Sequence, residues 1–466
     1  MAKAKWISIG LIFASLVALS LTQRNRYDDK RDLPPGPYCA DAGCCPGRQD
    51  QCSAPILGTL CYCDDFCNQT RVEDCCPDFW SHCKGIPPPE PPPTTTVEPP
   101  PETRACTYKG VNYRYGDTVK KNCNLCKCEQ IGNTVEFLCE RNVCLIDPLI
   151  VDTVNRERRY TWTASNYTKF WGKTLDQGIA TRLGTVQPEA FLMRMNPMKR
   201  IYNPNDLPRQ FDSLREWPTY ITAIQEQGDC AASWAISAAA VASDRFAIVS
   251  KGLETVQLSA QNLISCDRRG QQSCKGGHLD KAWRFMGSNG LVDEDCFPYL
   301  GYDERCRIDL FGDLRSSGCR LPANSYRTKK YMVGPAYRLG NETDIMLEIM
   351  KSGPVQATML VRNDFFTYSG GIYEHSDVFD IPKSGFLSVR IVGWGEEFTD
   401  NGLKKYWKVA NSWGEDWGED GYFRIVRGVD ESEIESFVIA AWPEIETRRY
   451  PSRPMPEEPD LYSNRI

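Results

Sequence analysis

The sequence predicts an α+β protein in which two small disulfide-rich modules precede a larger globular domain. Three observations support this fold class. The 22 cysteines of the 466-residue chain fall into three blocks, Cys39–Cys83, Cys106–Cys144 and Cys230–Cys319, and each block holds an even number. A Pro- and Thr-rich stretch separates the first block from the second. From about residue 206 to 445 the composition is globular, with a helical pattern early and strand patterns later.

The N-terminus predicts a signal peptide over residues 1–22. Lys3 and Lys5 precede an apolar run from Trp6 to Leu21, and Ala18-Leu19-Ser20 near its end offers small residues for cleavage, which is typical of a secretory signal. An uncleaved signal anchor is the alternative. No later segment is apolar enough to cross a bilayer. Dense cysteines persist as disulfides only in an oxidising compartment, so we expect a secreted, extracellular protein without a transmembrane anchor.

The first cysteine block predicts a disulfide-stapled module over residues 35–85. So short a segment with little apolar content cannot build an adequate core alone. A metal site is the alternative, which an oxidising route disfavours. The run from Cys61 to Cys67, followed by Asp74-Cys75-Cys76-Pro77, resembles the somatomedin B module. We expect disulfides among Cys39, Cys44, Cys45, Cys52, Cys61, Cys63, Cys67, Cys75, Cys76 and Cys83.

A spacer and a second module come next. Residues 86–103 are nearly all Pro, Thr and Glu, which predicts an extended linker without a packed core. Residues 104–146 carry six cysteines, and their C-x-x-C-x-C pattern at Cys123, Cys126 and Cys128 resembles von Willebrand factor C modules. A generic disulfide-stapled knot is the alternative. Either interpretation indicates an interaction module.

Residues 156–205 suggest processing and a pro-segment. Arg156-Glu157-Arg158-Arg159 has the R-x-R-R pattern that processing proteases cut, with charged surface as the alternative. Residues 160–205 resemble the propeptide of cathepsin B-like proteases, which runs back through the cleft, on Phe170-Trp171-Gly172 and Arg182-Leu183-Gly184-Thr185. At the far end, residues 446–466 are Pro- and charge-rich and predict a disordered tail.

The globular domain, residues 206–445, begins with a predicted buried helix and continues with predicted strands. The helix spans Ser233 to Ser250, and Gly252 acts as its stop signal. The strand-like runs are Val355–Val361, Leu387–Trp394, Tyr406–Ala410 and Gly421–Arg427.

Three segments of this domain resemble the catalytic segments of papain-family proteases. Gln227 to Trp234 resembles the segment that carries the reacting cysteine, with Ser233 in the cysteine's place. Ser388 to Gly395 resembles the strand after the family's histidine, which puts Leu387 in the histidine's place. Asn411-Ser412-Trp413-Gly414 matches the motif of the orienting asparagine. The resemblance implies a helical lobe, a β-barrel-like lobe and a cleft between them, lined by Gly276, Gly277 and Trp413.

The missing groups argue against hydrolysis. A serine hydroxyl becomes a nucleophile only with a base within hydrogen-bond reach, and Leu387 offers none. Losing the nucleophile or the base of a triad costs on the order of 10⁶-fold in rate. His278 and His375 are poor substitutes, because neither stands at the base position. We therefore expect no enzyme activity, with Gln227 and Asn411 as remnants, and we expect no cofactor and no metal.

By analogy with cathepsin B, the resemblance also implies three disulfides, Cys230–Cys274, Cys266–Cys306 and Cys296–Cys319. Three N-x-[ST] sequons make Asn68, Asn166 and Asn341 candidate glycosylation sites in a secreted chain.

The order of these modules resembles the tubulointerstitial nephritis antigen family over residues 35–445. That resemblance implies a secreted glycoprotein of the extracellular matrix or basement membrane, which binds matrix proteins or cell-surface receptors. One alternative is a secreted carrier or inhibitor that holds a ligand or protease in its cleft, and another is a residual hydrolase. The net charge is −6 and the basic clusters are short, so we expect no nucleic-acid partner.

Overall fold

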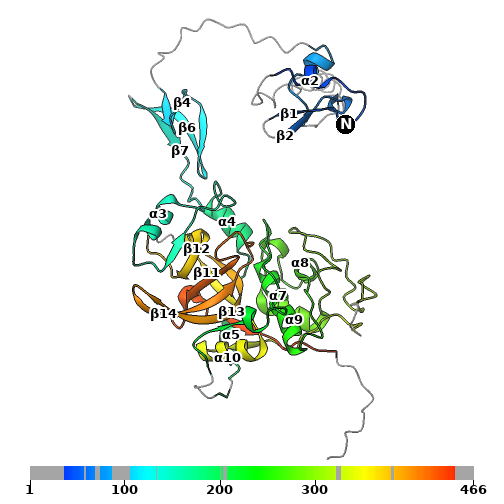
Figure 1. The fold of residues 1–466 in the computed structure, drawn as a ribbon, viewed down its shortest axis with the longest axis vertical. Coiled ribbons are helices and arrows are strands. Elements are labelled where there is room, and N and C mark those ends of the chain that lie inside the picture. The colour runs from blue at the N-terminus through cyan, green and yellow to red at the C-terminus, as the bar shows by residue number, and fades with distance from the viewer. Residues whose placement is uncertain are drawn as a thin grey trace, which may run out of the picture. The chain divides into compact units, whose positions relative to one another are not determined.

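The computed structural model describes two compact units, Met1–Glu102 and Thr103–Ile466 (Figure 1). The described residues are 36–446 except 57–58, 69–73, 87–104, 133, 200, 203–206, 322–326 and 379–382. The predicted signal peptide, nearly all of the linker and nearly all of the tail lie outside them. Within the described ranges, every helix is too short or too polar to span a bilayer.

The first unit is a cystine-stapled knot. It contains a short helix, α2 (Tyr38–Ala42), and one antiparallel pair, β1 (Ser53–Ile56) with β2 (Thr59–Tyr62). Two short helical turns follow, η1 (Asp65–Asn68) and η2 (Phe79–Cys83). Its buried core is mostly cysteine. The five disulfides are Cys39–Cys63, Cys44–Cys83, Cys45–Cys52, Cys61–Cys76 and Cys67–Cys75.

These bonds leave no thiolate for the alternative metal site in this module. The sulfur atoms of Cys39, Cys63 and Cys76 lie close enough together to hold an ion. However, each of the three is already in a disulfide, and a metal ligand must be a free thiolate.

The second module is a small antiparallel β structure. Strands β3 (Cys106–Tyr108) and β4 (Val111–Tyr113) pair, and β5 (Thr118–Lys121), β6 (Asn124–Ile131) and β7 (Thr134–Cys139) form a three-stranded sheet. Three disulfides staple it, namely Cys106–Cys128, Cys123–Cys144 and Cys126–Cys139. As the even cysteine counts predict, every disulfide of the chain stays within its own block.

A helix that the sequence analysis did not predict, α3 (Pro148–Arg156), joins this module to the larger domain. The Asp147 side chain accepts a hydrogen bond from Leu149 N and caps the helix, and Pro148 occupies the first turn, where proline is tolerated. Ile150 and Val154 are buried in the same hydrophobic core as the large sheet. Thus the helix packs on the domain although it precedes the propeptide-like segment.

The larger domain has the predicted two lobes. Helices α7 (Ser233–Val249), α8 (Ala260–Cys266) and α9 (Leu279–Asn289) form the helical lobe, which lies beside the β lobe in Figure 1. Each lobe has its own buried core. Helix α7 ends one residue before the predicted end, and it is buried almost all round, so periodicity alone says little about it.

A nine-stranded sheet forms the β lobe, in the order β10-β16-β11-β13-β14-β15-β12-β8 with β9 paired to β13. The predicted strands appear as β11, β13, β14 and β15, and the rest were not predicted. The bounds are β8 Trp162–Ala164, β9 Phe211–Asp212, β10 Tyr337–Leu339, β11 Val355–Val361, β12 Tyr368–Tyr373, β13 Gly385–Thr399, β14 Gly402–Ala410, β15 Tyr422–Val426 and β16 Val438–Ala440.

The remaining elements are short or peripheral to the sheet. They are α4 Leu175–Arg182, α5 Ala190–Met193, α6 Ser213–Glu216, α10 Glu342–Ser352, η4 Ser273–Lys275, η5 Asn363–Thr367 and η6 Glu431–Glu433.

A buried ion pair ties α7 to the β lobe. The Arg245 guanidinium lies 2.9 Å from Glu348 Oε1 on α10, and both side chains are at most 1% exposed. The same guanidinium donates to the carbonyls of Pro354 and Ala441, and Tyr337 donates its hydroxyl to Glu348. Because every charge here has partners, the pair is tolerated inside the protein.

Replacing Glu348 with alanine should lower the free energy of unfolding by about 3–5 kcal/mol, because it leaves the Arg245 charge buried and uncompensated. Chemical denaturation would measure the loss. The matched control is Arg284→Ala, which removes the exposed arginine of the Asp280–Arg284 pair on α9 and should cost less than about 1 kcal/mol. Equal effects of the two substitutions would contradict the prediction.

Candidate functional site

The site that the papain resemblance points to lies at the N-terminus of α7. Gly228 takes a positive φ of 62° in the turn before the helix, and the Cys230–Cys274 disulfide fastens that turn to the helical lobe. Ala231 N donates to the Cys274 carbonyl at 2.9 Å. These contacts place Ser233 as the first residue of α7, where a papain-family protease has its nucleophile.

Ser233 is completely buried, and its hydroxyl is fully engaged. Its Oγ donates to the main-chain carbonyl of Leu183 and lies 3.1 Å from Thr185 Oγ1. It also accepts a hydrogen bond of 3.3 Å from Ser388 N. None of these partners is a base that could take the hydroxyl proton, so the contacts hold Ser233 as a structural hydrogen-bonding group.

Leu387 lies on β13, one residue before the amide that reaches Ser233. It pairs with Met359 on β11 and is completely buried in the core of the β lobe. The side chain has no atom that could accept a proton. The position that sequence reasoning assigned to the catalytic base is therefore next to Ser233 and filled by hydrocarbon.

Asn411 and Gln227 have other partners in place of catalytic ones. Asn411 follows β14, and its Oδ1 accepts from Ser412 N, while its buried Nδ2 has no partner among the described residues. Gln227 Nε2 donates to the carbonyls of Thr181 and Cys230 at 3.1 and 2.8 Å. An oxyanion hole needs donors aimed at open space where charge develops, and the Gln227 amide is already committed.

The cleft itself is filled by residues 182–186 of the propeptide-like segment. On the helical lobe, Gly277 N donates to the Gly184 carbonyl and Val186 N donates to the Gly277 carbonyl, both at 2.9 Å. On the β lobe, Thr185 N donates to the Phe386 carbonyl at 3.1 Å, and the Trp413 indole donates to the Arg182 carbonyl at 2.9 Å. Main-chain hydrogen bonds thus fasten the segment to both walls.

Glycine is required where the backbones come closest. Gly184 has a positive φ of 84°, and a Cβ there would lie 2.0 Å from the Ala231 carbonyl oxygen. A Cβ on Gly277 would lie 2.5 Å from the Trp234 ring. Gly276 is less crowded, with a Cβ that would lie 3.0 Å from the Gly184 carbonyl oxygen, but its positive φ of 128° also favours glycine. The three glycines let the segment lie directly on the cleft floor, above Ser233.

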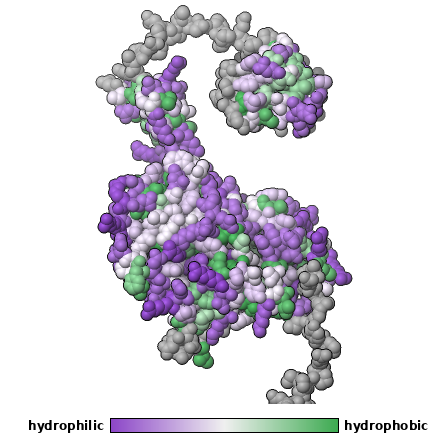
Figure 2. All heavy atoms as spheres, viewed as in Figure 1, coloured by the Kyte–Doolittle hydropathy of each residue, from purple (hydrophilic) through white to green (hydrophobic). Residues whose placement is uncertain are grey.

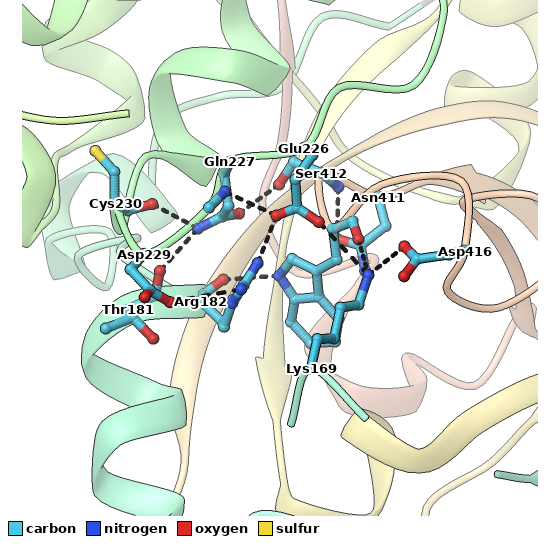
Figure 3. Close-up of polar contacts among 12 residues, drawn as sticks. Lys169, Thr181, Arg182, Glu226, Gln227, Asp229, Cys230, Asn411, Ser412 and Asp416 are labelled. Atoms are coloured by element: carbon cyan, nitrogen blue, oxygen red, sulfur yellow. Dashed lines mark hydrogen bonds and ion pairs between the residues drawn. The ribbon is translucent and has the colours of Figure 1, made fainter. Parts of the chain in front are cut away.

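Ion pairs between the propeptide-like stretch and the papain-like domain also anchor residues 182–186 (Figure 3). The Arg182 side chain is only 6% exposed and pairs with Glu226 and, at 3.5 Å, with Asp229. Lys169 pairs with Asp416 and Glu226 at 2.5 and 3.5 Å. Sequence reasoning noted the motif around Arg182 but did not identify this cluster, because its partners lie more than 40 residues away.

A second lysine of the longer propeptide-like stretch, residues 160–205, adds to the charged cluster. Lys173 Nζ lies 2.9 Å from Asp229 Oδ1. Its hydrogen bond is the main cause that holds the pKa of Asp229 below the ordinary value. Asp229 therefore keeps its charge, and its attraction for Lys173 and Arg182, at a lower pH than an ordinary aspartate does.

The two histidines of this domain serve local structure. His278 is half-buried at the start of α9, and its backbone exchanges hydrogen bonds with the Gln271 side chain. Burial lowers the pKa of His278. His375 Nδ1 lies 3.0 Å from Asp364 Oδ2, in a site that Tyr373 also joins. Neither is among the residues that contact Ser233.

The candidate glycosylation sites differ in their surroundings. Asn166 is exposed. Asn341 is exposed too, but its side chain caps α10 by accepting from Asp344 N at 2.8 Å. Asn68 is the last residue of η1. The structure also contains the three disulfides expected by analogy, Cys230–Cys274, Cys266–Cys306 and Cys296–Cys319.

Comparisons with known proteins agree with this architecture. Residues 207–442 match the family described as papain family cysteine protease. Tubulointerstitial nephritis antigen-like of Mus musculus is 42% identical over 94% of this chain and 97% of its own length. Tubulointerstitial nephritis antigen of Homo sapiens is 40% identical over 89% of this chain and 88% of its own.

A solved structure supports the fold. It is procathepsin B S9 from Trypanosoma congolense, with 32% identity and a TM-score of 0.54 over 65% of this chain and 99% of that one. The match extends over the whole of that proenzyme, in keeping with the propeptide-like segment described above. The chain therefore belongs to the tubulointerstitial nephritis antigen family, and its larger domain to the papain family.

Proposed function

We propose that this protein is a secreted, catalytically inactive glycoprotein of the extracellular matrix, which binds matrix proteins or cell-surface receptors. In this proposal the cathepsin B-like domain is a rigid scaffold, and the two disulfide-rich modules make the contacts. The observation that supports it most is the environment of Ser233. This residue is buried, its hydroxyl donates to the main-chain carbonyl of Leu183, and Leu387 stands in the place of the base.

The inactive state rests on two independent features. A serine protease needs a base beside the hydroxyl, and the contacts of Ser233 provide none. A substrate also needs access to the nucleophile, while residues 182–186 occupy the cleft with hydrogen bonds to both walls. Supplying a base would still leave the cleft filled, and opening the cleft would still leave Ser233 without a base.

The von Willebrand factor C-like module offers a surface for partners. Large apolar side chains on its strands and turns are 48–68% exposed, although the module is small. In Figure 2 hydrophobic residues stand among hydrophilic ones on this module. A contiguous exposed apolar patch is typical of a protein-binding surface, and in this proposal the exposed side chains of the module contribute to one. They are Val111, Tyr115, Leu125, Ile131 and Leu138.

The filled cleft weighs against the carrier or inhibitor alternative. A ligand or protease bound there would first have to displace residues 182–186. Fractionation of a tagged form from secreting cells, with crosslinking, distinguishes the matrix-protein hypothesis from the carrier or inhibitor hypothesis. Recovery in the insoluble matrix with matrix or receptor partners supports the proposal. Recovery as a soluble complex with one ligand or protease would overturn it.

The purified protein should show no turnover of peptide substrates above a buffer blank, because a hydroxyl without a base is a poor nucleophile. Fluorogenic substrates of cathepsin B and of serine proteases provide the measurement. Ser233→Ala is the control and should give the same blank value. Turnover that Ser233→Ala abolishes would revive the hydrolase alternative.

A cysteine at position 233 should measure how well residues 182–186 shield this position from reagents in solution. All 22 cysteines are paired, so Ser233→Cys introduces the only free thiol. We expect it to react slowly with a maleimide, and at least about tenfold faster when Arg182→Met removes the buried cation that holds the segment, which corresponds to about 1.4 kcal/mol. Lys383→Met, which removes the exposed contact with Asp176 on α4, should change the rate much less.

Changing the exposed apolar surface of the second module should reduce matrix retention. Leu125→Ser with Leu138→Ser removes two side chains that are 48% and 54% exposed, so the fold should persist. The matched control is Leu253→Ser in the helical lobe, where the side chain is 80% exposed. Retention that falls equally with both changes, or with neither, would argue against this module as the binding surface.

A further inference from the structure

The R-x-R-R tetrad forms an exposed turn between two packed elements. Arg156 is the last residue of α3, and Trp162 begins β8. All four residues from Arg156 to Arg159 are exposed. Main-chain support within the turn is sparse: Glu157 N donates to Thr153, and Tyr160 N donates to Glu157 at 3.2 Å. An endoprotease therefore has to open only a few hydrogen bonds to extend this stretch.

We propose that the Arg159–Tyr160 peptide bond is a processing site for an endoprotease selective for R-x-R-R, and that the two fragments remain associated after cleavage. Hydrolysis adds one water, breaks the C–N bond, and leaves a carboxylate on Arg159 and an ammonium group on Tyr160. The proposal goes beyond the proposed function, and it can be tested on the purified protein whatever that protein binds.

Side-chain contacts restrain the scissile residue without burying it. The Arg159 guanidinium lies 2.6 Å from Glu157 Oε2 and 2.7 Å from Asp377 Oδ1, and Asn401 Nδ2 donates to the Arg159 carbonyl at 3.0 Å. The Tyr160 hydroxyl also donates to Asp377 at 2.7 Å. Exposed ion pairs of this kind are weak, so they slow opening of the turn but do not prevent it.

The restraint should persist at the acidity of secretory compartments. The contact with Arg159 is the main cause that lowers the pKa of Asp377 to about 2. A carboxylate with that pKa stays ionised through the mildly acidic range, so acidification alone does not free Arg159. Removal of the carboxylate by mutation is therefore the direct way to loosen the turn.

Packing across the cut site would hold the fragments together. On the N-terminal side, Ile150 and Val154 are buried in the core of the β lobe. Asn155 exchanges two hydrogen bonds with the main chain of Ala164, at 2.8 and 2.9 Å, directly across the turn. On the C-terminal side, Trp162 is buried against Tyr368 and Tyr373. Cleavage thus severs the covalent connection but leaves these contacts intact.

The disulfides do not bridge the cut. The last pair before Arg159 is Cys123–Cys144, and the first after it is Cys230–Cys274, with all 22 cysteines accounted for. Unlike many processed secreted chains, the fragments would therefore separate in detergent without a reducing agent. This gives the proposal a distinctive signature on a gel.

The test is incubation of the purified, full-length secreted protein with a calcium-dependent serine endoprotease of R-x-R-R specificity. We expect one cut, a new N-terminus at Tyr160, two bands on a non-reducing denaturing gel, and a single peak on native gel filtration. Arg159→Ala and Arg156→Ala should each abolish the cut. Asp377→Asn should speed it about two- to fivefold, because it releases Arg159 from an exposed ion pair.

Two outcomes would overturn the proposal. Resistance of both the natural chain and the Asp377→Asn variant would remove the processing site. Fragments that separate on native gel filtration would remove the claim that α3 retains them. The control variant Arg315→Ala, in a different exposed segment with arginine, should leave both the rate and the cut position unchanged.

Discussion

The main-chain hydrogen bonds of residues 182–186 keep the cleft of the larger domain filled. They join the segment to Gly277 on the helical lobe and to Phe386 on the β lobe, so one stretch of backbone spans the cleft. Because the Leu183 carbonyl takes the Ser233 hydrogen bond, the same stretch occupies the place where a substrate would react. The whole propeptide-like stretch is an integral part of the domain, because its strand β8 belongs to the large sheet and Trp162 is buried in the core of the β lobe.

Charge supports this arrangement from outside the cleft. Arg182 is buried between two carboxylates, while Lys169 and Lys173 lie on the rim with more solvent. Water screens all of these pairs in part, because the Glu226 and Asp229 side chains are 43% and 68% exposed, and it screens Arg182 least, since that side chain is 6% exposed. Within the domain, the Arg245–Glu348 pair plays a comparable role between the helical lobe and α10. Both pairs connect elements that are far apart in sequence.

The features that sequence reasoning could predict were local. The frame around Ser233, the strand after Leu387 and the long helix α7 are short continuous patterns, and the fold class follows from them. Helix α3 and the three-residue strands were not predicted, because their patterns are too brief to stand out and packing against the sheet stabilises them. Asn341 has a sequon, but only the structure reveals that its side chain caps α10.

The contacts of Cys144 connect the second disulfide-rich module to the segment that fills the cleft. Its disulfide fastens it to Cys123 in the module, and the chain on either side pairs antiparallel with residues 173–175 through two hydrogen bonds of 2.8 and 2.9 Å. Residue 175 begins α4, and α4 ends at Arg182, where the cleft segment starts. The pairing and α4 therefore form a continuous connection from the second module to the segment over Ser233, along which a load on the module would be transmitted.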